Sequence, residues 1–150
     1  EELGVFHEHE LEALHDIRME AFVRSLEIEV AILYDMLWEG ILPALSKQLI
    51  LEKNSLSALD GLEFPEGEPW REYILDLGRT RGTLIEDAHR LNELRGRMAE
   101  LPVRERADFL VGTAIPLMDS IRKRCDAAEV NMAADIWPYP ISRNLLSLSV

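Results

Sequence analysis

Two Glu-x-x-His elements are the residues of this sequence best suited to chemistry: Glu12 with His15, and Glu86 with His89. Residues three apart share a helix face, so each pair could hold a metal ion, as in di-iron carboxylate bundles. Such a centre also needs a glutamate from each of two further helices. The third helix expected below has just Glu129, near its far end, and Asp119 is its one mid-helix candidate for an inward carboxylate. We therefore predict no metal site, and keep a di-metal centre at these four residues as the alternative.

Other reactive patterns are absent or incomplete. His7 and His9 do not form the HExxH zinc pattern, because the residue four after His7 is Leu11, and they are typical of a polar helix start. Cys125 occupies an apolar helix position and is predicted to be a small core residue. There is no glycine-rich phosphate loop and no CxxC motif. We predict no catalytic residue and no cofactor-binding residue in this chain.

Glu27 and Glu29 stand two residues apart, a spacing that would place both carboxylates on one face of a strand for magnesium. On a helix they point about 200° apart and cannot share an ion. We expect them to pair with arginines of a neighbouring helix, either Arg81 or Arg95, because a buried charge needs a partner.

Composition excludes several classes of function. The chain has 150 residues, 47% of them hydrophobic, so it is long enough for one domain with a true core. Its formal charge is -12, from 16 basic and 28 acidic residues, which argues against binding to nucleic acid or to a membrane surface. One cysteine and the lack of a signal peptide or membrane span indicate a cytoplasmic protein. The start at Glu1, without methionine, is expected of a fragment of a longer enzyme.

The candidate residues must be positioned by helices. From Glu8 to about Lys53, apolar residues recur with a spacing near 3.6, which predicts one long helix, kinked where Gly40 and Pro43 stand. Turn-forming residues at 54–67 predict a loop. A second helix is expected from Pro69 to Leu101, because apolar residues fall at every seventh position: Trp70, Leu77, Leu84, Leu91 and Met98.

Pro102 closes the second helix and opens the third after a very short turn, so these two helices should form an antiparallel hairpin. The third helix is expected to end near Ile136 and to carry the same kink device at Gly112 and Pro116. The predicted fold is all-α: three long antiparallel helices in a bundle, the first longest, kinked and overhanging the others, with an extended C-terminal tail. One helical domain should span residues 1–150.

Two stretches of the sequence together suggest a family. GVFHEHELEALHDIRMEAFVRSLEIEVAILYDMLWEGILPAL, near the start, and AIPLMDSIRKRCDAAEVNMAADIWPYPISRNLL, near the end, resemble the C-terminal region of type III glutamine synthetases. The shared features are the G-V-[FL] start, an element of the I-E-x-E or I-E-I-E type, which reads L-E-I-E at 26–29 here, then I-L-P-A, and W-P-x-P followed by a leucine pair. The two stretches occur in the same order as in that family.

This resemblance implies a parent enzyme that joins ammonia to glutamate with ATP and with magnesium or manganese, as a large ring-based oligomer. The metal ligands and nucleotide site would belong to a catalytic region upstream of Glu1, so this segment would be a non-catalytic domain with a structural and subunit-contact role. Its partners would be the catalytic region of the same chain and neighbouring subunits. The alternatives are the di-metal bundle above and a helical adaptor that binds another protein through Ile28 to Trp38, a segment too apolar for an ordinary half-exposed helix.

The C-terminal tail cannot continue a helix, because Pro138 and Pro140 hold it extended. We expect its apolar side chains to lie as a strap in a groove of this bundle or of the catalytic region. The predicted interface residues are Trp38, Trp137, Tyr139, Leu145 and Leu146.

Overall fold

The computed structural model describes residues 8–59, 61 and 67–140, and nearly all of them are helical. This confirms the all-α prediction and the long first helix. Within these residues there is no strand, and no helix is apolar over a stretch long enough to cross a membrane. The elements are α1 (Glu8–Asp35), the π-helical turn η1 (Met36–Ile41), α2 (Leu42–Ser57), α3 (Gly67–Glu100), α4 (Val103–Phe109), the π-helical turn η2 (Leu110–Ala114) and α5 (Ile115–Val130).

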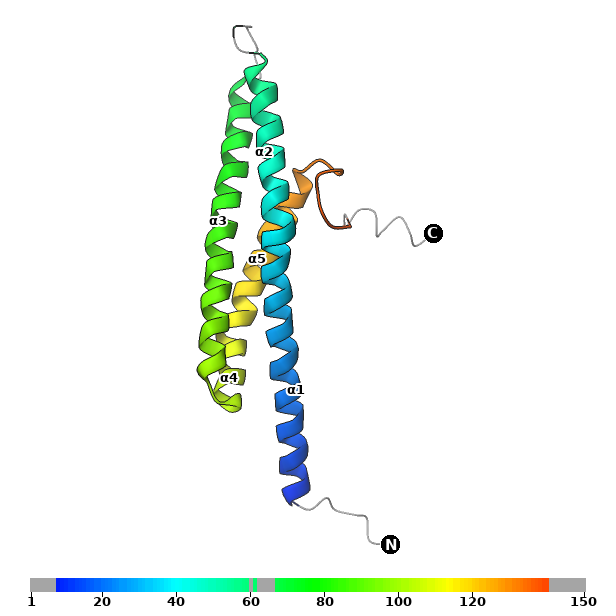
Figure 1. Ribbon diagram of the computed structural model, residues 1–150, viewed down its shortest axis with the longest axis vertical. Helices are drawn as coiled ribbons and strands as arrows, with labels where there is room; N and C mark the ends of the chain where they lie inside the picture. The colour runs from blue at the N-terminus through cyan, green and yellow to red at the C-terminus, as the bar shows by residue number, and fades with distance from the viewer. Residues whose placement is uncertain (1–7, 60, 62–66, 141–150) are drawn as a thin grey trace, which may run out of the picture.

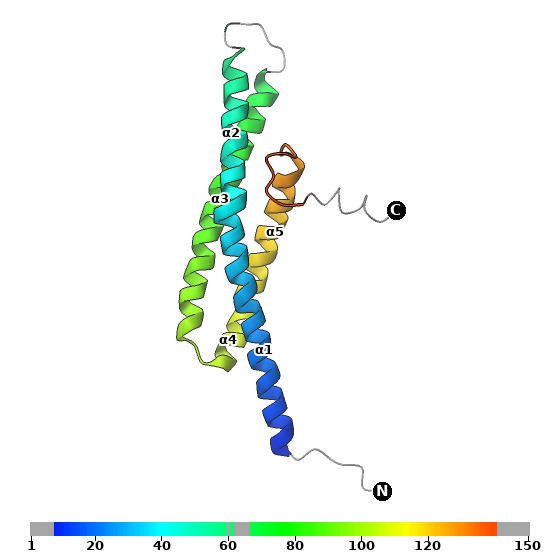
Figure 2. The ribbon, with the colours of Figure 1, turned by 45° about the vertical axis from the view of Figure 1, so that its right-hand side comes forward.

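These elements form three rods that lie side by side (Figure 1). The first rod is α1, η1 and α2; α3 returns alongside it in the opposite direction; and the third rod is α4, η2 and α5. The view in Figure 2 shows that the N-terminal part of α1 extends past the turn between α3 and α4. The expected overhang of the first helix is therefore present.

The core lies where the three rods meet, and the leucine heptads of α3 supply its centre. Leu77, Leu84, Leu91 and Met98 are buried as predicted, whereas Trp70, at the end of the series, is half-buried. The first rod contributes a face at Val23, Leu26, Val30, Leu33, Leu37 and Leu45, and the third rod one at Leu110, Ala114, Met118, Ile121, Cys125 and Ala128. The prediction that Cys125 is a core residue is confirmed.

The apolar repeat that predicted the first helix also includes Leu11, Leu14 and Phe22, which are exposed by 52%, 40% and 43%. Leu11 and Leu14 lie near the start of α1, on the overhang, where the neighbouring helices cover little of it. Phe22 instead precedes Val23, which is 3% exposed, so it lies on the covered part of α1 at the edge of the buried face. Periodicity marked an apolar face correctly but could not show where the neighbouring helices end.

The kinks predicted at the two glycine and proline pairs take the form of π-helical turns. Proline has no N–H to bond the carbonyl four residues earlier, so the regular bonding pattern cannot continue through it. Before Pro43, the N–H of Leu42 bonds the Leu37 carbonyl, five residues back. Before Pro116, the N–H of Ile115 bonds the Leu110 carbonyl in the same way.

Two predicted helix ends differ from the structure. The first rod continues to Ser57, beyond the predicted start of the loop, since the Ala58 N–H still bonds the Asn54 carbonyl. The third rod ends at Val130, not near Ile136, and the N–H groups of Ile136 and Trp137 bond the carbonyl of Ala133 instead. After Val130 the chain forms turns whose apolar residues Met132 and Trp137 pack on the core. Their spacing in the sequence resembles that of a helix, which is why the helix was predicted to continue. The described part of the tail, residues 131–140, is therefore a series of turns and bends and not the extended segment that was predicted.

Candidate functional site

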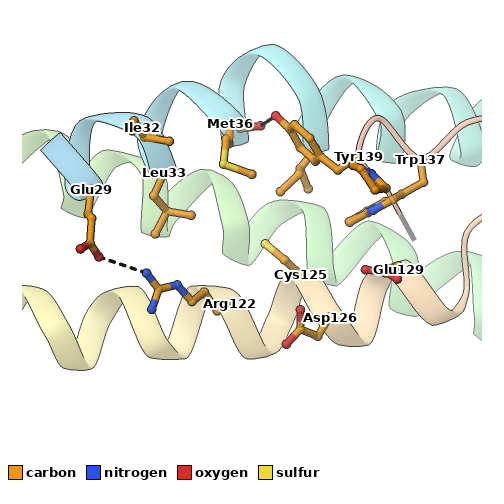
Figure 3. A pocket seen from close by; sticks show the side chains of 12 residues that line it. Glu29, Ile32, Leu33, Met36, Arg122, Cys125, Asp126, Glu129, Trp137 and Tyr139 are labelled. Carbon is orange, nitrogen blue, oxygen red and sulfur yellow. Dashed lines mark hydrogen bonds and ion pairs between the residues drawn. The ribbon is translucent and has the colours of Figure 1, made fainter. Parts of the chain in front are cut away.

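A hollow lies between α1 and α5, beside residues 131–140, which we call the strap (Figure 3). It is a groove of about 270 Å³. Its apolar lining includes Leu33 and Met36 from the first rod and Trp137 and Tyr139 from the strap. Glu29 and Arg122 face each other across its rim, 3.4 Å apart.

The strap is anchored in this groove by its two aromatic residues. Trp137 is only 8% exposed. The Tyr139 hydroxyl donates a hydrogen bond of 3.2 Å to the carbonyl of Met36, the first residue of η1. Gly40 leaves the space for this ring, since a Cβ there would lie 2.9 Å from Tyr139 Cζ and closer still to the hydroxyl oxygen. The strap and the π-helical turn thus fit each other.

The other end of the strap is tied to α2 and α3. The backbone N–H of Ala133 donates to Gln48 Oε1 at 3.3 Å, and the Tyr73 hydroxyl donates to the Asn131 carbonyl at 2.6 Å. Gln48 is itself buried, and its Nε2 donates to Glu52. The strap is therefore joined to the first rod by two hydrogen bonds and to α3 by one.

The predicted interface residues fall into three groups. Trp137 and Tyr139, which belong to the strap, line the groove between α1 and α5, so this part of the tail packs on the bundle itself. Trp38 lies apart from them, 38% exposed, with its ring against those of Tyr34 and His89. Leu145 and Leu146 lie outside the described residues.

Cys125 lines the groove but is not prepared for nucleophilic chemistry. Burial, with the nearby carboxylates of Asp126 and Asp87 as further causes, raises the pKa of its thiol from 9.0 to about 12. The thiol is thus protonated at neutral pH, and the thiolate is the nucleophilic form. Burial likewise raises the pKa of Tyr139 above its usual value of 10.0, with Glu39 as the next cause. The groove is a packing site for the strap.

This environment predicts slow alkylation of Cys125. In the folded chain at pH 8, iodoacetamide should react with the thiol at least about a hundredfold more slowly than in the urea-unfolded chain, measured by mass spectrometry. Because the folded pKa is raised, this thiol's stabilising contribution is complete below pH 9 and is lost as the pH rises toward 12. Equal alkylation rates in the two states would contradict the buried position.

The two Glu-x-x-His elements are not brought together. Glu12 and His15 lie on the overhang of α1, where His15 Nδ1 is 3.7 Å from Asp16. His89 instead contacts Trp38, 23 residues further along the first rod, a distance of about 35 Å at the rise of an α-helix. No group of three metal-binding side chains occurs among the residues that the structure describes. The geometry gives the di-metal alternative no support.

Glu27 and Glu29 do pair with arginines of another helix, but the predicted partners are wrong. Arg106 bonds Glu27 at 2.9 Å and Arg122 bonds Glu29 at 3.4 Å, both from the third rod. Arg81 instead donates to Ser46 at 2.8 Å, and the guanidinium of Arg95 lies 5.3 Å from the centre of the Tyr34 ring. Both α3 arginines contact the first rod, but Glu27 and Glu29 lie on the face of α1 that is turned toward the third rod.

The two ion pairs should differ in their contribution to stability. Arg106 also donates to the Leu101 carbonyl at 2.8 Å, and its side chain is 23% exposed. The Arg122 side chain is 55% exposed. Arg106→Ala is expected to lower the free energy of unfolding by about 1.5 kcal/mol and Arg122→Ala by less than about 0.5 kcal/mol, measured by urea denaturation. Equal losses of unfolding free energy in the two variants would show that burial does not decide how much each ion pair contributes.

One buried charge was missed by the sequence analysis. Asp87 is 0% exposed, and its Oδ2 accepts a hydrogen bond of 2.6 Å from Arg124 Nη1, which ties α3 to α5. Asp87 stands three residues after Leu84 and four before Leu91, so the heptad already placed it at the helix interface. An aspartate between two leucines of the heptad could therefore have indicated a buried charge that needs a partner.

The fold is thus an all-helical one with a groove between α1 and α5, one wall of which is formed by the chain's own strap. In a comparison with protein-family models, residues 1–57 match the glutamine synthetase C-terminal domain. This confirms the predicted recognition of such a domain and includes the first of the two resembling stretches, 4–45, while the second, 114–146, lies outside the matched residues. Comparisons with curated proteins and with solved structures found no match.

Proposed function

We propose that this chain is the non-catalytic helical C-terminal domain of a type III glutamine synthetase, with a structural and subunit-contact role. The match of residues 1–57 to the family carries the proposal. The type III subtype rests on sequence motifs, above all W-P-Y-P at 137–140. ATP and magnesium or manganese would bind a catalytic region of the same cytoplasmic enzyme, outside this domain.

The subunit-contact role is supported by a second apolar face on α1. Leu14, Ile17, Ile28 and Ile32 are 40%, 63%, 54% and 53% exposed. At 100° per residue these four positions lie within about 60° of one another, on the side away from the core residues Val23 to Leu37. An exposed apolar stripe of this length on a helix is typical of a protein contact. We propose that it packs on the catalytic region or on a neighbouring subunit.

The test uses the longer natural enzyme that contains this domain. Its ATP-dependent conversion of glutamate and ammonia to glutamine should be measured beside its mass in analytical ultracentrifugation. Ile28→Glu with Ile32→Glu should dissociate the assembly and lower activity with it. Leu75→Glu with Val130→Glu, which changes residues 59% and 70% exposed on other helices, should leave both intact.

The two parts of the proposal can fail separately. A longer enzyme that makes no glutamine would overturn the family assignment of the whole chain. An active enzyme that stays assembled in the Ile28 and Ile32 variant would overturn the contact role of this face alone.

A further inference from the structure

The exposed apolar face of α1 follows a regular repeat. In chain order it consists of six exposed residues: Leu14, Ile17, Ala21, Ser25, Ile28 and Ile32. The first three positions recur eleven residues later as the last three, and a repeat of eleven residues, about 3.67 per turn, stays in line along a nearly straight helix. A partner helix can therefore stay in contact over the whole stretch, about 27 Å. We call these six residues the α1 stripe.

The α1 stripe reads nearly the same in both directions along the helix. Two large aliphatic side chains stand at each end, and the two small side chains stand in the middle. Matched from the ends inward, the residues form three pairs whose midpoints all lie within about half a residue of position 23. These pairs are Leu14 with Ile32, Ile17 with Ile28, and Ala21 with Ser25. Such a surface is complementary to its own copy in the antiparallel direction, because a two-fold contact joins residue i to j and residue j to i.

The stripe lies where a second copy can reach it. It is on the side of α1 opposite Val30, which is 0% exposed, so the other two rods of each copy stay on the outside of such a pair. The Ser25 hydroxyl, the one polar side-chain group of the stripe, donates a hydrogen bond of 3.0 Å to the Phe22 carbonyl of its own helix. Contact at this face therefore leaves no side-chain polar group of the stripe without a hydrogen bond.

We infer that the α1 stripe packs against the α1 stripe of a second copy in the antiparallel direction. The two-fold axis passes next to Ala21 and Ser25, whose small side chains let the helix axes approach to the short end of the usual 8–10 Å. On either side of the axis, Leu14 meets Ile32 of the other copy and Ile17 meets Ile28. The inference rests on the subunit-contact role proposed above and names the partner.

The charges along the stripe permit this pairing. Within its length the charged residues that flank it are Arg18, Glu20, Arg24 and Glu29, two of each sign, so the net charge of -12 is not concentrated here. A single pair of helices in contact over about 27 Å makes a small interface, below about 1,200 Å² in total. We expect a dissociation constant between about 10 µM and about 1 mM for the chain by itself. Inside a larger assembly, where effective concentrations reach the millimolar range, the contact is occupied.

A mixture of two cysteine variants tests the direction of the pairing. The chain of residues 1–150 is used in a Cys125→Ala background, with glutathione disulfide as the oxidant. When Leu14→Cys and Ile32→Cys are mixed at about 100 µM, the disulfide between the two variants should exceed that within either variant at least about fivefold, measured by mass spectrometry. Leu75→Cys, 59% exposed on α3, is the matched control and should show no such preference for either variant.

The ends of the stripe give a second test that depends on the same alignment. Antiparallel pairing brings Asp35, beyond one end, opposite Glu10 of the other copy, beyond the other end, so like charges meet and added salt should strengthen the association. In sedimentation equilibrium, Asp35→Lys should strengthen it at least about threefold, because opposite charges then meet. Glu72→Lys, which changes the net charge equally at an exposed position of α3, should have less effect. Ala21→Glu should weaken the association at least about tenfold, because it places two bulky charges beside the axis.

Three results would overturn the inference: a chain that stays monomeric to about 1 mM, disulfides within each variant as abundant as those between them, and equal effects of Asp35→Lys and Glu72→Lys. The contact role proposed for this face can survive such a failure. If the chain is monomeric but the longer enzyme dissociates when Ile28 and Ile32 are replaced, the face has another occupant, and this inference alone is wrong. The amount of glutamine that the longer enzyme makes bears on the family assignment only.

Discussion

Gly40→Ala is expected to release the strap, although alanine forms helices better than glycine by about 1 kcal/mol. The new methyl group would overlap the Tyr139 ring, so the ring must leave its place on η1. With it are lost the hydrogen bond to the Met36 carbonyl and much of the burial of Trp137. We expect a net loss of about 2 kcal/mol in the free energy of unfolding. Hydrogen exchange should show faster exchange at the amides of Ala133 and Trp137.

Gly112→Ala is the matched control for this prediction. Gly112 lies in the other π-helical turn before a proline, but a Cβ there would meet nothing within 4 Å. Its replacement should leave stability unchanged or raise it by up to about 1 kcal/mol. In a Tyr139→Ala background, Gly40→Ala should no longer be harmful, because the ring it displaces is gone. If Gly40→Ala behaved like Gly112→Ala in the unchanged chain, the fit between strap and turn would not contribute to stability.

Arg124→Ala is expected to have the larger effect on stability, about 3 kcal/mol by urea denaturation. It removes the 2.6 Å partner of the Asp87 carboxylate, which is fully buried and cannot turn to water. Asp87 Oδ1 has no hydrogen bond, and the remaining cation, Arg90, is 3.5 Å away on an exposed side chain. The loss comes from leaving a buried charge without its partner.

The matched control is Arg79→Ala. Arg79 also bonds an aspartate, Asp76, at 2.6 Å, but the two side chains are 71% and 62% exposed. Its loss should be less than about 0.5 kcal/mol. Asp87→Leu combined with Arg124→Leu should recover most of the stability lost in Arg124→Ala, because an apolar pair needs no desolvation of charge. Equal losses for Arg124→Ala and Arg79→Ala would show that burial of Asp87 does not decide the effect.

The predicted residues show which parts of the site could be read from sequence. The heptad of α3 predicted its buried face, since Leu77, Leu84 and Leu91 recur at the period that places them together on any helix. Pro43 and Pro116 predicted the two irregular turns, because a missing N–H acts within four or five residues. The pairing of Glu27 and Glu29 with arginines followed from charge, but their partners depended on how the helices are rotated about their axes.

The sequence by itself therefore determined that the chain is helical, where its helices are interrupted, which residues form apolar helix faces, and that its start resembles a glutamine synthetase C-terminal domain. These properties depend on neighbours within about one or two turns of helix. Only the tertiary structure decided that Tyr139 fits against Gly40, that Arg106 meets Glu27, that Asp87 is buried beside Arg124, and that Leu11 and Leu14 remain exposed. Each of these depends on the lengths and rotations of packed rods, which set contacts between residues far apart in the chain and leave no periodic signal along it.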